Sequence, residues 1–111
     1  MVPPAYDLAA GAASMADPRV FAADDAIDVT TVNALRQRLE AHLDAHGPYI
    51  WIDLGGVTYI DSTGLGMLVG LLREARDRGG DVGLLHPSRQ VHRILQITGL
   101  EPIFGVGFSP L

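Results

Sequence analysis

The sequence contains no cysteine and no lysine. Without cysteine there is no disulfide framework, no thiol nucleophile and no cysteine-ligated zinc site. All eight basic residues are arginine, and the formal net charge is −5. An acidic chain without a basic run is poorly suited to nucleic acid or to an anionic membrane surface. We therefore expect neither as a partner.

Long apolar runs are also missing. The longest apolar stretch, near Gly64–Leu72, is far shorter than the roughly 18 residues that a membrane-spanning helix needs. The N-terminus lacks the early positive charge of a secretory signal, and Asp7 interrupts its short apolar run. These features predict a cytoplasmic protein.

A chain of 111 residues with 48% hydrophobic and 19% charged residues has the size and balance of one small globular domain. Residues 1–19 are rich in alanine, glycine and proline, which fits a tail or a weak first strand around Tyr6–Ala9. Residues 20–111 are expected to form the folded domain.

Hydrophobic periodicity beyond residue 19 alternates between strands and helices. Asp28 or Thr30 can cap a first helix that Gly47 ends. Its apolar stripe at helical spacing comprises Val32, Leu35, Leu39 and Leu43. The other expected elements are strands at 20–23, 49–54, 82–85 and 102–106, a short extended piece at 57–60, a helix at 63–78 and a third helix between the Ser88 cap and Gly99. The alternation implies an α/β sandwich with a largely parallel sheet.

The second helix has two faces of different character. Its expected core face comprises Leu65, Leu68, Val69, Leu72 and Ala75. At 100° per residue, Gly66, Met67 and Gly70 lie away from that stripe. Two glycines and an exposed methionine would give a surface of low relief, suited to the close approach of a partner; cover by another layer of the protein is the alternative. The third helix, capped by Ser88, would bury Val91, Ile94 and Leu95, with Ile97 as a further candidate.

The segment Asp61–Gly66 (DSTGLG) places three oxygen-bearing side chains at the start of the second helix. The first N–H groups of a helix lack intrahelical partners and favour negative charge. One interpretation is that Asp61 or Ser62 caps the helix and does nothing more. The other is that this helix start is a functional site.

The stretch from Tyr59 to Phe104 resembles the STAS domain of bacterial anti-sigma factor antagonists. The similarity rests on the DSTGLG block, the Gly79-Gly80 pair after the helix and the later ITGL block, and it extends back to about residue 20. It implies a mixed, largely parallel sheet of four or five strands with helices mainly on one face. It also implies that Ser62 is phosphorylated by a serine kinase that is itself the anti-sigma factor, with Thr63 as the competing hydroxyl.

In that family the unphosphorylated antagonist binds the kinase and frees a sigma factor, and a PP2C-type phosphatase reverses the phosphorylation. The partner-binding residues implied here are Asp28, Asp61, Ser62, Thr63, Gly64, Gly66, Met67 and Gly70. Two departures stand out. Asp25-Ala26-Ile27-Asp28 replaces the usual Gly-Glu-Leu-Asp, and we expect the family's final helix to be absent, because few residues follow the last expected strand. If that helix covers part of the core in the family, a homodimer or the N-terminal residues would have to cover the same part of the core here.

Three rival functions remain: a STAS subunit of a transporter ATPase assembly, a stress-signalling scaffold without a phospho-switch, and a relative that has lost its partner. Enzymatic activity is not expected. A hydrolase would need a base near Ser62, and the glycines of 64–70 miss the dinucleotide fingerprint by one residue. His42 and His46 share a helix face but lack a third metal ligand. We expect neither a cofactor nor a metal.

Overall fold

The computed structural model describes residues 17–106 of the chain. The element order alternates strands and helices, as the periodicity predicted. The elements are β1 (Val20–Asp24), α1 (Val32–His46), β2 (Tyr49–Gly56), α2 (Ser62–Asp77), β3 (Asp81–Leu85), α3 (Arg89–Ile97), the 3-10 helix η3 (Glu101–Ile103) and β4 (Gly105–Val106).

The strands form one sheet in the order β1-β2-β3-β4, and neighbouring strands pair in parallel. This confirms the α/β class and the parallel sheet. The strand expected at 102–106 is shorter than predicted, because residues 101–103 turn as η3 and only Gly105–Val106 pair with β3. The described residues therefore supply three full strands and one two-residue strand, without an antiparallel pair. The weak strand expected at Tyr6–Ala9 lies outside the described residues.

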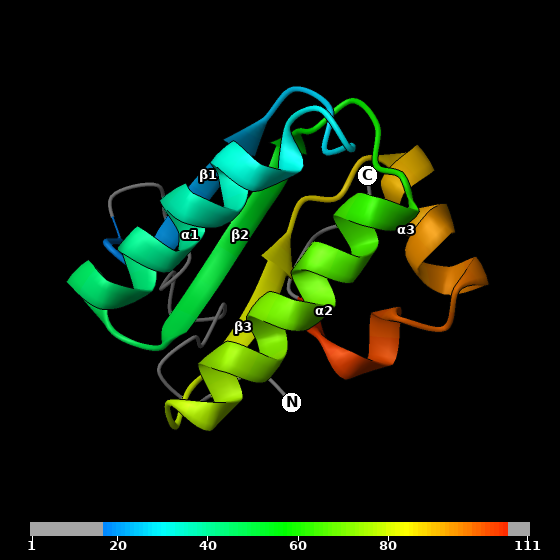
Figure 1. The fold of residues 1–111 in the computed structure, drawn as a ribbon. Coiled ribbons are helices and arrows are strands. Elements are labelled where there is room, and N and C mark those ends of the chain that lie inside the picture. The colour runs from blue at the N-terminus through cyan, green and yellow to red at the C-terminus, as the bar shows by residue number, and fades with distance from the viewer. Residues whose placement is uncertain (1–16, 107–111) are drawn as a thin grey trace.

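The two faces of the sheet are packed differently. Ile50, Ile52 and Leu54 of β2 point into the main core, together with residues from all three α-helices. Figure 1 shows α1 and α2 side by side over this face. On the other face, Trp51 packs with Leu85 and is fully buried. The period of two along β2 explains this division, since successive side chains point to opposite faces.

Helix α1 buries the predicted stripe of Val32, Leu35, Leu39 and Leu43. The buried face of α2 is wider than the sequence predicted. The helix packs against the sheet and also alongside α1 (Figure 1), so Met67 and Leu71 are buried as well. A single apolar stripe does not describe a helix with two packed neighbours. In α3, Val91 and Leu95 are buried, but Ile97 is 72% exposed and does not join the core.

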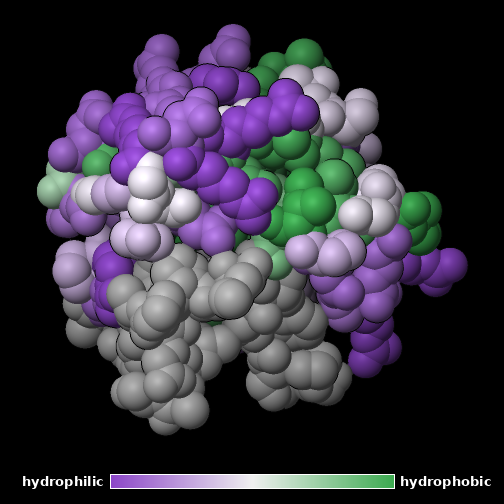
Figure 2. All heavy atoms as spheres, turned by 90° about the horizontal axis from the view of Figure 1, so that it is seen from below, coloured by the Kyte–Doolittle hydropathy of each residue, from purple (hydrophilic) through white to green (hydrophobic). Residues whose placement is uncertain are grey.

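The strands begin at the end of the molecule that Figure 2 views. Hydrophilic residues cover the upper left of this view, and a hydrophobic area lies on the right. Leu100 and Ile103, next to and within η3, are among the partly buried hydrophobic residues that pack against the core. No helix among residues 17–106 is both long and apolar enough to cross a membrane. The strands end, and α1 and α2 begin, at the opposite end of the molecule.

Candidate functional site

Two loops run side by side at the end of the molecule where the strands stop. The first joins β1 to α1 and the second joins β2 to α2. The backbone N–H of Ile27 donates to the carbonyl of Tyr59 at 2.8 Å, and the N–H of Asp61 donates to the carbonyl of Ile27 at 3.2 Å. Ile27 pairs with Ile60 in an isolated parallel bridge, and both side chains are buried. This pairing fixes the start of α2 against the loop that contains Asp28.

Asp61 is the N-cap of α2 and also joins the two loops. Its Oδ1 accepts a hydrogen bond from the N–H of Gly64 at 2.9 Å, and its Oδ2 accepts one from the N–H of Val29 at 3.3 Å. The first bond is the capping interaction that the sequence predicted. The second spans 32 positions in the chain, and no local pattern in the sequence indicated it. Of the two capping candidates, Asp61 therefore performs this role.

Ser62 and Thr63 are the first two residues of α2, and both are exposed. The unpaired N–H groups of the first helical turn lie beside them and favour an added negative charge. Exposure alone does not choose between the two hydroxyls. The structure therefore places both expected phosphorylation candidates at an accessible helix start.

Asp28 organises the loop before α1. Its Oδ1 accepts hydrogen bonds from the N–H of Thr30 at 2.8 Å and from the Thr30 hydroxyl at 2.6 Å. These bonds, first of all that from the hydroxyl, lower the pKa of Asp28. The N-cap of α1 is Thr31 rather than Asp28 or Thr30, and its side chain makes no capping bond to the helix. Asp28 instead stabilises the turn that leads into the helix and stays ionised.

The three glycines of α2 have different environments. A Cβ on Gly64 would lie 2.5 Å from the carbonyl oxygen of Ile27, whereas nothing lies within 4 Å of one on Gly66. A Cβ on Gly70 would lie 3.6 Å from the Arg36 guanidinium. Gly66 thus lies on an open surface, as expected, and Gly70 lies half-buried beside Arg36.

Two of the expected partner-binding residues are inside the protein. Met67 is only 2% exposed and belongs to the main core, so the prediction of an exposed methionine was wrong. Gly64 is buried as well, because the start of α2 packs directly on the Ile27–Ile60 bridge. Neither residue can form part of a flat outer surface.

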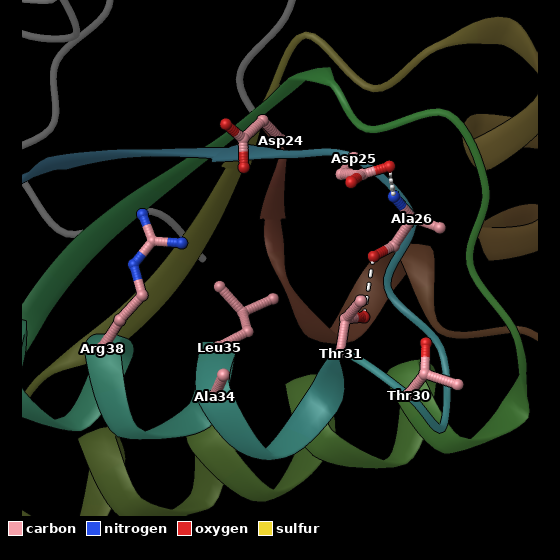
Figure 3. A pocket seen from close by; sticks show the side chains of 8 residues that line it. All are labelled: Asp24, Asp25, Ala26, Thr30, Thr31, Ala34, Leu35 and Arg38. Carbon is pink, nitrogen blue, oxygen red and sulfur yellow. Dashed lines mark hydrogen bonds between the residues drawn. The ribbon is translucent and has the colours of Figure 1, made fainter.

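A cavity of about 270 Å³ lies between the end of β1, the loop that follows it and the first turns of α1. Figure 3 shows Asp24 and Asp25 above it, Leu35 of α1 below it, and Arg38 at one end. The Thr31 hydroxyl donates to the carbonyl of Ala26 at 2.8 Å and closes the opposite end. No pattern in the sequence indicated this cavity, since it depends on how the loop turns between strand and helix.

The family model of the STAS domain matches residues 13–110. The chain belongs to the STAS domain family. An anti-sigma-B factor antagonist of Listeria monocytogenes is 36% identical over 87 residues, which cover 78% of this chain and 75% of that protein. An anti-sigma factor antagonist from Mycobacterium paratuberculosis has a similar structure, with a TM-score of 0.70 and 27% identity over 83% of this chain and 77% of that one. The Bacillus cell fate determinant SpoIIAA in its phosphorylated form has a TM-score of 0.64 at 22% identity, covering 87% and 88% of the two chains.

Asp25 explains one departure of this STAS domain from the usual motif. Its φ of 63° lies in the left-handed region, which favours glycine and tolerates aspartate better than most other residues. Its carboxylate accepts a hydrogen bond from the N–H of Ala26 at 2.9 Å. The backbone conformation that suits the usual glycine is therefore kept, and a carboxylate is added to the surface beside the cavity.

The histidines of this STAS domain contact groups other than Ser62. The His42 ring packs edge-on against Phe21 and close to His46, while His86 Nδ1 lies 3.5 Å from Asp53. His92 Nε2 pairs with the Glu101 carboxylate. Across residues 17–106, no three histidine, aspartate or glutamate side chains are grouped closely enough to hold a metal ion.

Proposed function

We propose that this protein is an anti-sigma factor antagonist that binds an anti-sigma factor serine kinase and is switched off by phosphorylation of Ser62. Its output is binding rather than catalysis: the unmodified protein occupies the kinase, and a sigma factor is released in the bacterial cytoplasm. A PP2C-type phosphatase reverses the modification. The names of its relatives and the match of the DSTGLG block to the family motif support this proposal.

One observation carries the proposal: the side chain that caps α2 and the exposed hydroxyl of its first residue belong to different residues. Asp61 caps α2, and Ser62 is exposed at the first helical position. A phosphate on Ser62 would therefore remove no hydrogen bond that the fold needs. The unpaired N–H groups of the first turn would also favour its charge. Such a modification can regulate binding without unfolding the protein.

The switch acts through charge. Phosphorylation adds a charge of about −1.5 to −2 at pH 7. Asp61, and Asp28 on the adjoining loop, already place carboxylates near the start of α2. Water solvates the added phosphate in the free protein. Covered by a partner, the same phosphate would lose that solvation while lying near like charges, which disfavours the complex.

The test combines phosphate mapping with binding. The protein is incubated with ATP and each candidate anti-sigma factor kinase from its own organism, and the product is mapped by mass spectrometry. We expect phosphate on Ser62, absent from Ser62→Ala and retained in Thr63→Ala. Ser62→Ala should bind the kinase as tightly as the wild type, and Ser62→Asp should bind at least about tenfold more weakly, equivalent to about 1.4 kcal/mol.

Two results would contradict the proposal. Phosphate that persists in Ser62→Ala but is lost in Thr63→Ala would move the switch to Thr63. A folded wild-type protein that neither binds nor is modified by any of these kinases would instead favour a transporter-linked subunit or a scaffold without a phospho-switch.

A further inference from the structure

Large exposed hydrophobic side chains are rare in this fold and unevenly placed. Among residues 17–106 they are Val29, 68% exposed, Tyr59, 46% exposed, and Ile97, 72% exposed. Ile97 is the last residue of α3. Val29 and Tyr59 belong to the two loops that meet at the N-cap of α2. They are therefore close to Ser62 in the fold, although 30 positions separate them from each other in the sequence.

The backbone holds both residues on either side of the N-cap. The N–H of Val29 donates to the Asp61 carboxylate, and the carbonyl of Tyr59 accepts from the N–H of Ile27. Their neighbours Ile27 and Ile60 are buried, so the chain is anchored beside each exposed side chain. Exposed apolar groups on a fixed backbone lose little further conformational freedom when they are covered. Such preorganisation favours binding, and tyrosine is among the residues enriched at the energetic centres of interfaces.

The surroundings of these two side chains are acidic. Residues 24–31 and 53–62, which form the loops and the strand ends next to them, contain no arginine. Their charged residues are Asp24, Asp25, Asp28, Asp53 and Asp61. Among residues 17–106, Arg38 is the one basic residue that lines the adjoining cavity. A partner surface complementary to this region is apolar at its centre and basic around it.

We propose that Val29 and Tyr59 are the apolar anchors of the kinase-docking surface, and that the kinase meets them with an apolar patch surrounded by basic residues. This inference rests on the proposed function and specifies which residues of the chain hold the partner. It adds two residues that neither the DSTGLG block nor the glycines of α2 indicate. Ser62 directly follows Asp61, whose carboxylate accepts from the Val29 N–H, and it comes three positions after Tyr59.

The experiment compares matched exposed positions. Val29→Ser and Tyr59→Ser each remove an apolar anchor, and Tyr59→Phe keeps the aromatic ring. Ile97→Ser removes a side chain on α3 that is about as exposed as that of Val29. Affinity for the kinase that phosphorylates Ser62 is measured by calorimetry. We expect Val29→Ser and Tyr59→Ser to weaken binding at least about tenfold, and Tyr59→Phe and Ile97→Ser to change it less than about twofold. Wild-type affinity should also fall as salt is raised.

The outcomes separate this inference from the proposed function. If the wild type binds the kinase while Val29→Ser and Tyr59→Ser bind as tightly as Ile97→Ser, the docking inference is wrong and the proposed function stands. If the folded wild type binds no kinase, both fail. A wild-type homodimer that Val29→Ser or Tyr59→Ser dissociates in sedimentation experiments would make a second copy the occupant and overturn the kinase as the partner of this surface.

Discussion

Gly64 and Gly66 belong to the same helix, yet alanine should have opposite effects at the two positions. A Cβ on Gly64 would lie 2.5 Å from the carbonyl oxygen of Ile27 and 2.9 Å from Cγ1 of Ile60. The Ile27 carbonyl cannot easily retreat, because it accepts the hydrogen bond from the N–H of Asp61. Alanine at 64 must therefore push α2 away from the bridge between the two loops.

The magnitude follows from three terms. Overpacking a well-packed contact costs about 1–3 kcal/mol, and weakening the bond to Ile27 costs about 1 kcal/mol more. The better helix propensity of alanine returns about 1 kcal/mol. We expect Gly64→Ala to lower the free energy of unfolding by about 2 kcal/mol. A Cβ on Gly66 would have nothing within 4 Å, so Gly66→Ala should raise that free energy by about 0.5–1 kcal/mol.

Urea denaturation followed by circular dichroism measures both changes. With an m value of about 1–2 kcal/mol/M, the midpoint of Gly64→Ala should fall by about 1–2 M, and that of Gly66→Ala should rise slightly. Unchanged m values would show that neither substitution alters the surface exposed on unfolding, so that the midpoints report stability directly. A Gly64→Ala variant as stable as the wild type would refute the close packing of α2 on Ile27.

Two further predictions concern side-chain carboxylates. Asp61→Ala should lower the free energy of unfolding by about 1–2 kcal/mol, because it removes the hydrogen bonds from the N–H groups of Gly64 and Val29. Ser62→Ala is the matched control, and it should lower that free energy much less in the same urea titration. The hydrogen bond with Glu74 raises the pKa of Glu40, so the folded protein binds this proton more tightly than the unfolded chain, and stability is lost as pH rises through the raised value. From pH 4 to 7 the midpoint should therefore fall less, or rise more, with increasing pH in Glu40→Gln than in the wild type, and an identical pH dependence in the two proteins would argue against the Glu40–Glu74 bond.

Local pattern was enough to predict much of this fold. The leucine spacing of residues 32–43 predicted the buried face of α1, and the apolar run from Tyr49 predicted a central buried strand. The DSTGLG block predicted a helix start with Asp61 as a capping candidate. In each case the sequence signal lies within a few neighbouring residues, where periodicity and capping rules apply.

The errors came from contacts between distant segments. A single apolar stripe for α2 puts Met67 on the surface, whereas α2 packs against both the sheet and α1 and buries it. The bond from Val29 to Asp61 depends on the Ile27–Ile60 bridge, which only the assembled sheet creates. The left-handed conformation of Asp25 likewise follows from the path of the loop rather than from the residue type.

The position of Ser62 relative to the proposed anchors determines how a phosphate can oppose a basic partner. Basic groups around an interface compensate carboxylates at its edge, such as Asp24 and Asp25, where water still screens the charges. Ser62 follows Asp61, which accepts the hydrogen bond from the Val29 N–H, and it comes three positions after Tyr59. A phosphate there would have to be desolvated within the apolar centre, and that cost can exceed what basic groups at the rim return. On this proposal phosphorylation prevents docking because of where the charge lies, even though its sign alone would attract the partner.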